Sequence, residues 1–342
     1  MDKNTVIGLL LIFGLFMGFS FYQTHRNQKI REEQEKTMAE QAANPKQEQE
    51  TLSLADTVAQ TDTTAVKETK SPAQVFSNPQ VSNEDDYVVE TDKAIYRFGK
   101  KGGCLKSAIL KDVYRYTPKG ETKQPLELFA DGTNEMSIGL MLRDQTEIST
   151  KDCYFISDTE DTLKVDGKNN TLILRLYPNY KGEAVECGML DNASYIEYAY
   201  SFSNEDYRFG FKIRFVNMED YLYANKHDYT LVWNAQPECV EKNYEYEKNI
   251  TSVYYMDNVN EVDNLDERKD DKKDFTSPLK WVSFKQQFFT TCLIVDDEPF
   301  QSGTLSVNVP DKSEQSVLKN CNAELDFEIK DLNKGDFGMS MY

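Results

Sequence analysis

The sequence predicts a mainly β fold: a large β-sandwich that follows one transmembrane helix and a disordered tether. Three observations predict it. An uncharged apolar stretch lies near the start, a polar stretch almost free of aromatic residues follows, and the long remainder reads as short alternating strands. The predicted boundaries are 1–4 for a short cytoplasmic N-terminus, 5–24 for the anchor, 25–85 for a flexible polar linker and 86–342 for the sandwich.

The predicted anchor is uncharged from Asn4 to Thr24, and its core Val6–Tyr22 is almost wholly apolar. As a helix this core is roughly 26 Å long, close to the hydrocarbon thickness of a bilayer. Neither a small-residue cleavage site nor a lipobox cysteine follows it. We therefore expect an uncleaved signal anchor, with a cleaved secretory signal as the alternative.

The flanking charges bear on the orientation of this span. Lys3 precedes it, whereas His25, Arg26, Lys29 and Arg31 follow it, which mildly favours the opposite topology under the positive-inside rule. Long domains can cross a membrane regardless of flanking charge, so this bias does not exclude a single span with the large domain outside the cytoplasm, which is the placement that the resemblance described below implies.

The stretch 25–85 is rich in Gln, Glu, Thr, Ala, Ser and Lys, and Phe76 is its only aromatic residue. Apart from a short polar helix that Lys29–Glu40 can form, it has no periodic apolar face to bury. Such a composition predicts a disordered tether with a reach of several nanometres.

Short strands begin at Asp86. Alternating, β-branched or aromatic segments are separated by turn residues such as Gly102-Gly103 and Asp166-Gly167. More than a dozen such strands predict a two-sheet sandwich. The clearest segments are 87–92, 94–98, 105–110, 163–166, 172–177, 195–202, 209–216 and 230–233, and 336–342 reads as a last strand.

The formal net charge of -19 excludes several functions. Nucleic acid is not expected as a partner, because contacts to phosphates need a surplus of Lys and Arg. A broad electrostatic attachment to anionic lipid headgroups is disfavoured for the same reason.

Six cysteines occur without any CxxC pair, so neither a zinc site nor a thioredoxin-like motif is predicted, and we expect no metal or cofactor. The spacing leaves disulfides open, and buried free thiols are the favoured interpretation. His227 is the only histidine after residue 25, and no GxSxG elbow or phosphate-binding loop is present. We therefore expect no catalytic residues and no enzymatic activity.

Two further features of the sequence, an acidic run and the high aromatic content, each have two interpretations. The run 257–274 holds eight acids and four bases; it predicts a solvated excursion between strands, and a calcium site is the alternative although EF-hand spacing is missing. The 20 Tyr and 19 Phe predict sandwich core and cross-strand pairs. If exposed, they could instead stack on sugars, which makes a membrane-anchored carbohydrate-binding or saccharide-processing protein the rival hypothesis.

Several stretches together resemble the YidC membrane insertase family in its Bacteroidetes-like form. Residues 1–12 look like the family's first transmembrane helix, and Val89–Asp112 resembles the start of its periplasmic domain. Trp281–Phe289 is similar to its Trp-x-x-x-x-Gln-x-Phe/Tyr-Phe segment, and Leu231–Asn234 fits the strand region upstream. The resemblance covers essentially the whole chain.

The resemblance implies a periplasmic β-supersandwich, galactose mutarotase-like in fold, attached to the bacterial inner membrane. It implies a docking or chaperone-like domain that assists the insertion and folding of integral membrane proteins, with Sec translocon components and nascent membrane proteins as partners. The family's C-terminal insertase core of transmembrane helices has no counterpart in this sequence. Residues expected to pack between the sandwich and the membrane-proximal part, with plain core packing as the alternative, are Trp281, Phe284, Gln287, Phe288 and Phe289.

Overall fold

The computed structural model describes residues 86–130, 132–157, 161–168, 170–178, 193–296, 298–310 and 316–342, together with Phe76. All of them belong to one compact unit, Glu68–Tyr342. The predicted anchor and nearly all of the predicted linker lie outside the described residues. Within these ranges, no helix combines the length and apolar character that a membrane crossing requires.

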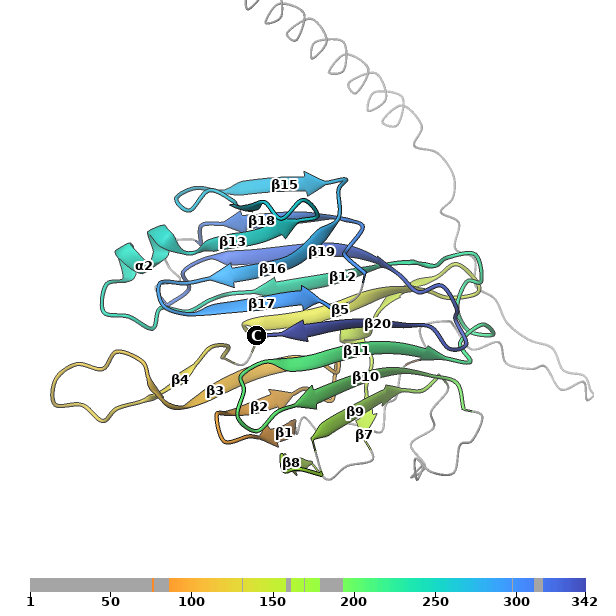
Figure 1. Cartoon of the computed structure of the whole chain (residues 1–342), viewed down its shortest axis with the longest axis horizontal. Helices are drawn as coiled ribbons and strands as arrows, with labels where there is room; N and C mark the ends of the chain where they lie inside the picture. The colour runs from red at the N-terminus through yellow and green to blue at the C-terminus, as the bar shows by residue number, and fades with distance from the viewer. Residues whose placement is uncertain are drawn as a thin grey trace, which may run out of the picture. The chain divides into compact units, whose positions relative to one another are not determined.

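The described chain is built almost wholly from strands, which form three sheets, and the prediction of a mainly β sandwich is confirmed (Figure 1). The largest sheet has nine strands, in the spatial order β14 (Val262–Asn264), β13 (Ser252–Asp257), β16 (Leu279–Lys285), β17 (Thr290–Val295), β20 (Asp336–Met341), β11 (Phe209–Val216), β10 (Tyr195–Phe202), β9 (Thr171–Leu176) and β7 (Ile156–Ser157).

Two smaller sheets complete the sandwich. The five-stranded sheet has the order β4 (Pro125–Glu127), β3 (Leu105–Tyr114), β2 (Ala94–Phe98), β1 (Tyr87–Glu90) and β8 (Thr162–Lys164). The six-stranded sheet has the order β15 (Asp271–Phe275), β18 (Ser302–Asn308), β19 (Asn320–Glu328), β12 (Asp228–Ala235), β5 (Asn134–Met141) and β6 (Glu147–Ser149). The described pairings are antiparallel apart from the parallel pair of β1 and β8.

Aromatic contacts show how the layers face each other. Phe98 on β2 lies 4.4 Å from Tyr200 on β10, centroid to centroid, so the five-stranded sheet covers the β9–β11 part of the large sheet. Phe327 on β19 lies 4.7 Å from Phe337 on β20, so the six-stranded sheet covers the other part. The second layer of the predicted two-sheet sandwich is thus divided into two sheets.

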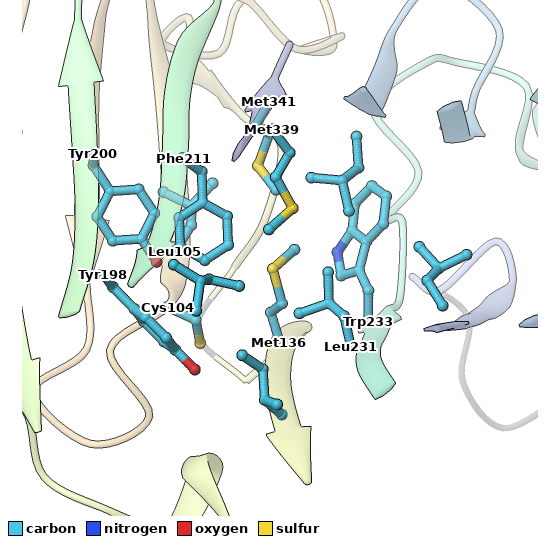
Figure 2. Packing of buried hydrophobic residues seen from close by; sticks show 14 of the residues in the cluster. Cys104, Leu105, Met136, Tyr198, Tyr200, Phe211, Leu231, Trp233, Met339 and Met341 are labelled. Atoms are coloured by element: carbon cyan, nitrogen blue, oxygen red, sulfur yellow. The ribbon is translucent and has the colours of Figure 1, made fainter. Parts of the chain in front are cut away.

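Alternation along each strand supplies this core. On β11, burial alternates from Phe209 to Phe215, with every second side chain inside. In Figure 2, Met136, Met339 and Met341 lie between Phe211 on one side and Trp233 on the other. Flexible thioether side chains suit this position, where two halves of a sandwich leave an irregular gap. Phe76, within the predicted linker, is also buried in this core.

The acidic run 257–274 is more ordered than the predicted excursion between strands, because it contains β14 and β15. Its carboxylates are used within the chain: Asp257 accepts hydrogen bonds from the backbone N–H groups of Val259 and Glu261, and Asp266 accepts one from Arg268. The short helix α2 (Tyr244–Ile250) precedes β13 and begins where the Asn243 side chain accepts a bond from Tyr246 N.

Candidate functional site

An apolar groove of about 320 Å³ opens at one end of the sandwich, where the five-stranded sheet and the nine-stranded sheet diverge. Strand β3 forms one wall, and the β16–β17 turn with the end of β20 forms the other. The lining residues are Tyr96, Leu105, Ala108, Leu110, Val113, Leu128, Phe129, Tyr207, Phe209, Phe288, Phe289, Thr290, Thr291, Met341 and Tyr342. They are apolar or aromatic apart from two threonines.

The β3 wall owes its shape to a break in the strand. Asp112 adopts a left-handed backbone with φ of 61°, and the pairing of β3 with β4 shifts register between Leu110 and Tyr114. Such a bulge bends a strand away from its sheet. Leu110, the last buried residue of β3 before the bulge, lines the groove, and the hairpin beyond Asp112 projects from the body (Figure 1).

The opposite wall is the turn between β16 and β17. Gln286 N donates to Phe289 O at 2.8 Å, which closes the turn, and Gln286 Nε2 donates to Glu238 O at 2.7 Å, which ties it to a neighbouring loop. Phe288 at its tip is 68% exposed at the mouth of the groove, whereas Phe289 is half-buried in its wall.

Of the five residues predicted to pack between parts of the protein, only Phe288 and Phe289 line the groove. Phe284 belongs to the core, with its ring 4.0 Å from that of Trp233. Trp281 pairs across strands with Met256 and Ile294 on the outer face of the large sheet. Gln287 is half-buried in the turn, and the bonds that fix the turn come from its neighbour Gln286.

The β3 side of the groove, with Leu110, Val113 and Leu128, was not predicted. Leu110 and Phe289 are nearly 180 positions apart, and local alternation gives no information about which distant segments meet at a sheet opening. The positions that the sequence did indicate are the two phenylalanines after Gln287, because they end the segment that resembles the family's Trp-x-x-x-x-Gln-x-Phe/Tyr-Phe pattern.

Polar chemistry in the groove is limited to a few groups. Tyr96 OH donates to the backbone oxygen of Tyr207 at 3.1 Å, and burial raises the pKa of Tyr96 above its ordinary range. His227 lies outside the groove lining, and its Nδ1 is 3.1 Å from the backbone oxygen of Ile329. Among the described side chains, no group of three or more metal-ligating residues comes together.

Fold and groove together define a large β-sandwich domain with an apolar groove at one end. The family described as YidC periplasmic domain matches residues 86–330, and the chain belongs to this family.

Curated relatives extend the similarity beyond the domain. Proteins named membrane protein insertase YidC match with 28% identity in Porphyromonas gingivalis, covering 96% of this chain and 49% of the relative. In Bacteroides fragilis the identity is 27%, covering 95% and 48%, and in Phocaeicola vulgatus it is 27%, covering 100% and 50%. The chain therefore spans about half the length of these relatives.

Solved structures with a similar fold include a galactose mutarotase related enzyme from Lactobacillus acidophilus, with 8% identity and a TM-score of 0.43 over 75% of this chain and 96% of that one. A galactose mutarotase-like protein from Lactobacillus casei matches with 8% identity and a TM-score of 0.40 over 75% and 98%. At these values neither structure carries information about activity.

Proposed function

We propose that this chain is the N-terminal part of a membrane protein insertase, and that its sandwich is a docking or chaperone-like module rather than an enzyme. The observation that carries the proposal is the match of residues 86–330 to the YidC periplasmic domain family. Relatives that match almost the whole chain are named membrane protein insertase YidC. The chain spans about half the length of those relatives, so its part in membrane protein insertion is also proposed.

The apolar groove is the proposed docking surface. Burying apolar surface is favourable, so a groove of about 320 Å³ with an apolar lining suits apolar side chains of a partner. Phe288 at the mouth and Phe289 in the wall are the proposed contacts to the rest of the insertase and to membrane proteins that it assists. Phe284 and Trp281 support this end of the sandwich from within and from its outer face.

The proposed placement follows from the sequence. Residues 5–24 anchor the chain in the inner membrane as one span, 25–85 link the anchor to the domain, and 86–342 lie in the periplasm. The apolar stretch Val6–Tyr22 supports the anchor, and the family description supports the periplasmic location of the domain.

A photo-crosslinking amino acid at position 288 tests the proposal in the full chain in its native membrane. We expect crosslinks to insertase or Sec components, or to newly made membrane proteins. The control carries the same group at Val259, which is 73% exposed. This residue follows β13 at the end of the strand that lies away from the β16–β17 turn. Docking at the groove would be refuted if position 288 gave no crosslinks to such proteins, or if positions 288 and 259 gave them equally.

A further inference from the structure

Three exposed tyrosines gather at the groove end of the molecule, outside the groove itself. Tyr114 and Tyr116 are 49% and 44% exposed on the β3–β4 hairpin, and Tyr246 is 54% exposed on α2. We call these three residues the tyrosine end. Most other tyrosines of the described residues are buried or half-buried, so this exposure is unusual for the chain.

Hydrogen bonds tie the hairpin to the segment that precedes α2. Tyr116 N donates to Val240 O at 2.8 Å, and Arg115 Nη2 donates to Cys239 O at 3.0 Å. The segment that accepts these bonds leads directly into α2. In Figure 1, the tip of the β3–β4 hairpin and α2 project at the same end of the sandwich.

Lysines accompany the tyrosines. Lys123 Nζ lies 5.2 Å from the ring centroid of Tyr114, and Lys242 Nζ lies 6.0 Å from that of Tyr116. The hairpin stretch 113–124 carries Arg115, Lys119 and Lys123 against one acid, in a chain whose net charge is -19. The hairpin is thus a small basic region on an acidic protein.

Acidic groups near α2 limit the size of this basic region. Glu245 pairs with Lys248 at 3.8 Å, and Glu247 is buried with its Oε2 accepting bonds from the backbone N–H groups of Val240 and Glu241. Glu241 remains as a partly exposed acid beside Lys242. The positive charge is therefore confined to the projecting hairpin.

We propose that the tyrosine end rests on the surface of the lipid bilayer, with the hairpin as its main contact. Tyrosine suits the lipid–water interface because its ring is apolar and its hydroxyl is polar, and Lys and Arg extend their charges to headgroups from the same depth. The basic hairpin complements anionic headgroups, whereas the acidic remainder of the domain is repelled by them.

The predicted anchor at Val6–Tyr22 supports lipid as the partner, because it places the domain beside a bilayer. The net charge disfavours a broad attachment, and the proposed contact is accordingly narrow: a hairpin that the bulge at Asp112 directs outward. This inference concerns lipid and goes beyond the proposed docking of proteins in the groove.

Tryptophan fluorescence in the full chain tests the contact. The variant Tyr116→Trp is reconstituted in vesicles of phosphatidylethanolamine and phosphatidylglycerol with brominated acyl chains, which quench tryptophan at short range. We expect emission from position 116 to fall about twofold relative to vesicles without bromine, after subtraction of the unsubstituted chain. The signal should return at about 1 M salt, where charge attraction to headgroups is screened.

Matched variants make the result specific. Val259→Trp carries the same anchor and places the reporter at the other end, so it should remain unquenched. On the Tyr116→Trp chain, Lys119→Glu with Lys123→Glu should abolish quenching, whereas Lys330→Glu with Lys334→Glu, at exposed positions far from the hairpin, should leave it intact. Quenching that is absent at 116, equal at 116 and 259, or insensitive to the hairpin charges would overturn the proposal. Since only lipid carries bromine, these outcomes are independent of the crosslinking result at position 288.

Discussion

Trp233 on β12 and Phe284 on β16 meet across the two layers of the sandwich, with ring centroids 4.0 Å apart. Trp233 is fully buried, and its Nε1 donates to Asn134 Oδ1 at 2.8 Å. This pair ties the six-stranded sheet to the nine-stranded sheet a few residues from the β16–β17 turn that bears Phe288.

Phe284→Ala should lower the free energy of unfolding by about 3–5 kcal/mol, because it leaves a cavity against Trp233. Urea unfolding followed by circular dichroism measures the change. Phe288→Ala is the control and should stay within about 0.5 kcal/mol, since this side chain is 68% exposed. Equal losses for the two variants would mean that the turn, and not the core, supports the fold here.

Asn134→Ala should cost about 1–3 kcal/mol, because it leaves the buried Trp233 N–H without an acceptor. The Asn134 side chain also donates to Leu105 O at 2.6 Å, so a contact between two sheets is lost with it. Asn308→Ala, on an exposed position at the end of β18, should change stability little. A cost for Asn134→Ala no greater than that of the control would contradict this role.

Lys319→Met should stabilise the protein by about 1–3 kcal/mol at neutral pH. Lys319 is fully buried, and its Nζ has no hydrogen-bond partner among the described residues. Burial lowers the pKa of Lys319 below its ordinary value.

The sign of the pH dependence follows from that lowered pKa. Below the folded-state pKa the ammonium is charged in both states, and the penalty of burying it is fully present. The penalty fades as the pH rises through the folded-state pKa towards the unfolded value of about 10.4. The advantage of Lys319→Met should therefore shrink between neutral pH and about pH 10, whereas Lys334→Met, at an exposed position, should show no such trend. A constant advantage would indicate a packing effect alone.

The buried thiols should react slowly in the folded protein. Burial raises the pKa of Cys153 and of Cys321 to about 12, and it also raises the pKa of Cys104. Because the thiolate is the reactive form, maleimide labelling at pH 8 should be at least about tenfold slower at these three positions than in urea. Peptide mapping by mass spectrometry gives the rate at each cysteine, and rapid labelling of Cys153 or Cys321 without denaturant would show that the core opens locally.

Gly103→Ala should destabilise the protein more than Gly120→Ala. Both glycines have positive φ, 65° and 101°, so each substitution carries a backbone strain of about 1–2 kcal/mol. A methyl group at Gly103 would also lie 2.8 Å from the Phe155 ring, whereas nothing lies within 4 Å at Gly120. We expect an additional loss of about 1–3 kcal/mol at Gly103. Thermal unfolding of both variants measures the difference, and equal shifts would mean that Phe155 moves freely.

The sequence predicted the strands whose alternation is regular. Tyr195–Phe202 and Phe209–Val216 begin and end as expected, because in each strand every second side chain is an apolar residue buried in the core. Strand β15 was missed because it lies at the edge of its sheet, where Lys272, Lys273 and Asp274 are exposed and no apolar period appears. Helix α2 was missed because its seven residues are too few for a helical period, although Asn243 is a capping residue.

The candidate site was only partly predictable. Residues 281–289 read as one apolar-aromatic segment, yet the chain turns after Lys285, so Phe284 enters the core while Phe288 reaches the surface. A turn fixed by the long-range bond from Gln286 to Glu238 leaves no local signal. The burial of Phe76 was not predicted, because this residue stands in a polar stretch that predicts a disordered tether.

Strand β20 lies in the interior of the nine-stranded sheet, paired with β17 on one side and β11 on the other, although it is the last of the described strands in sequence. A ribosome makes it after the other described strands, so β11 and β17 lack the strand that joins them until Met341 has emerged. The large sheet is therefore completed only when β20 has been made, and shorter nascent chains must keep the edges of β11 and β17 protected until then.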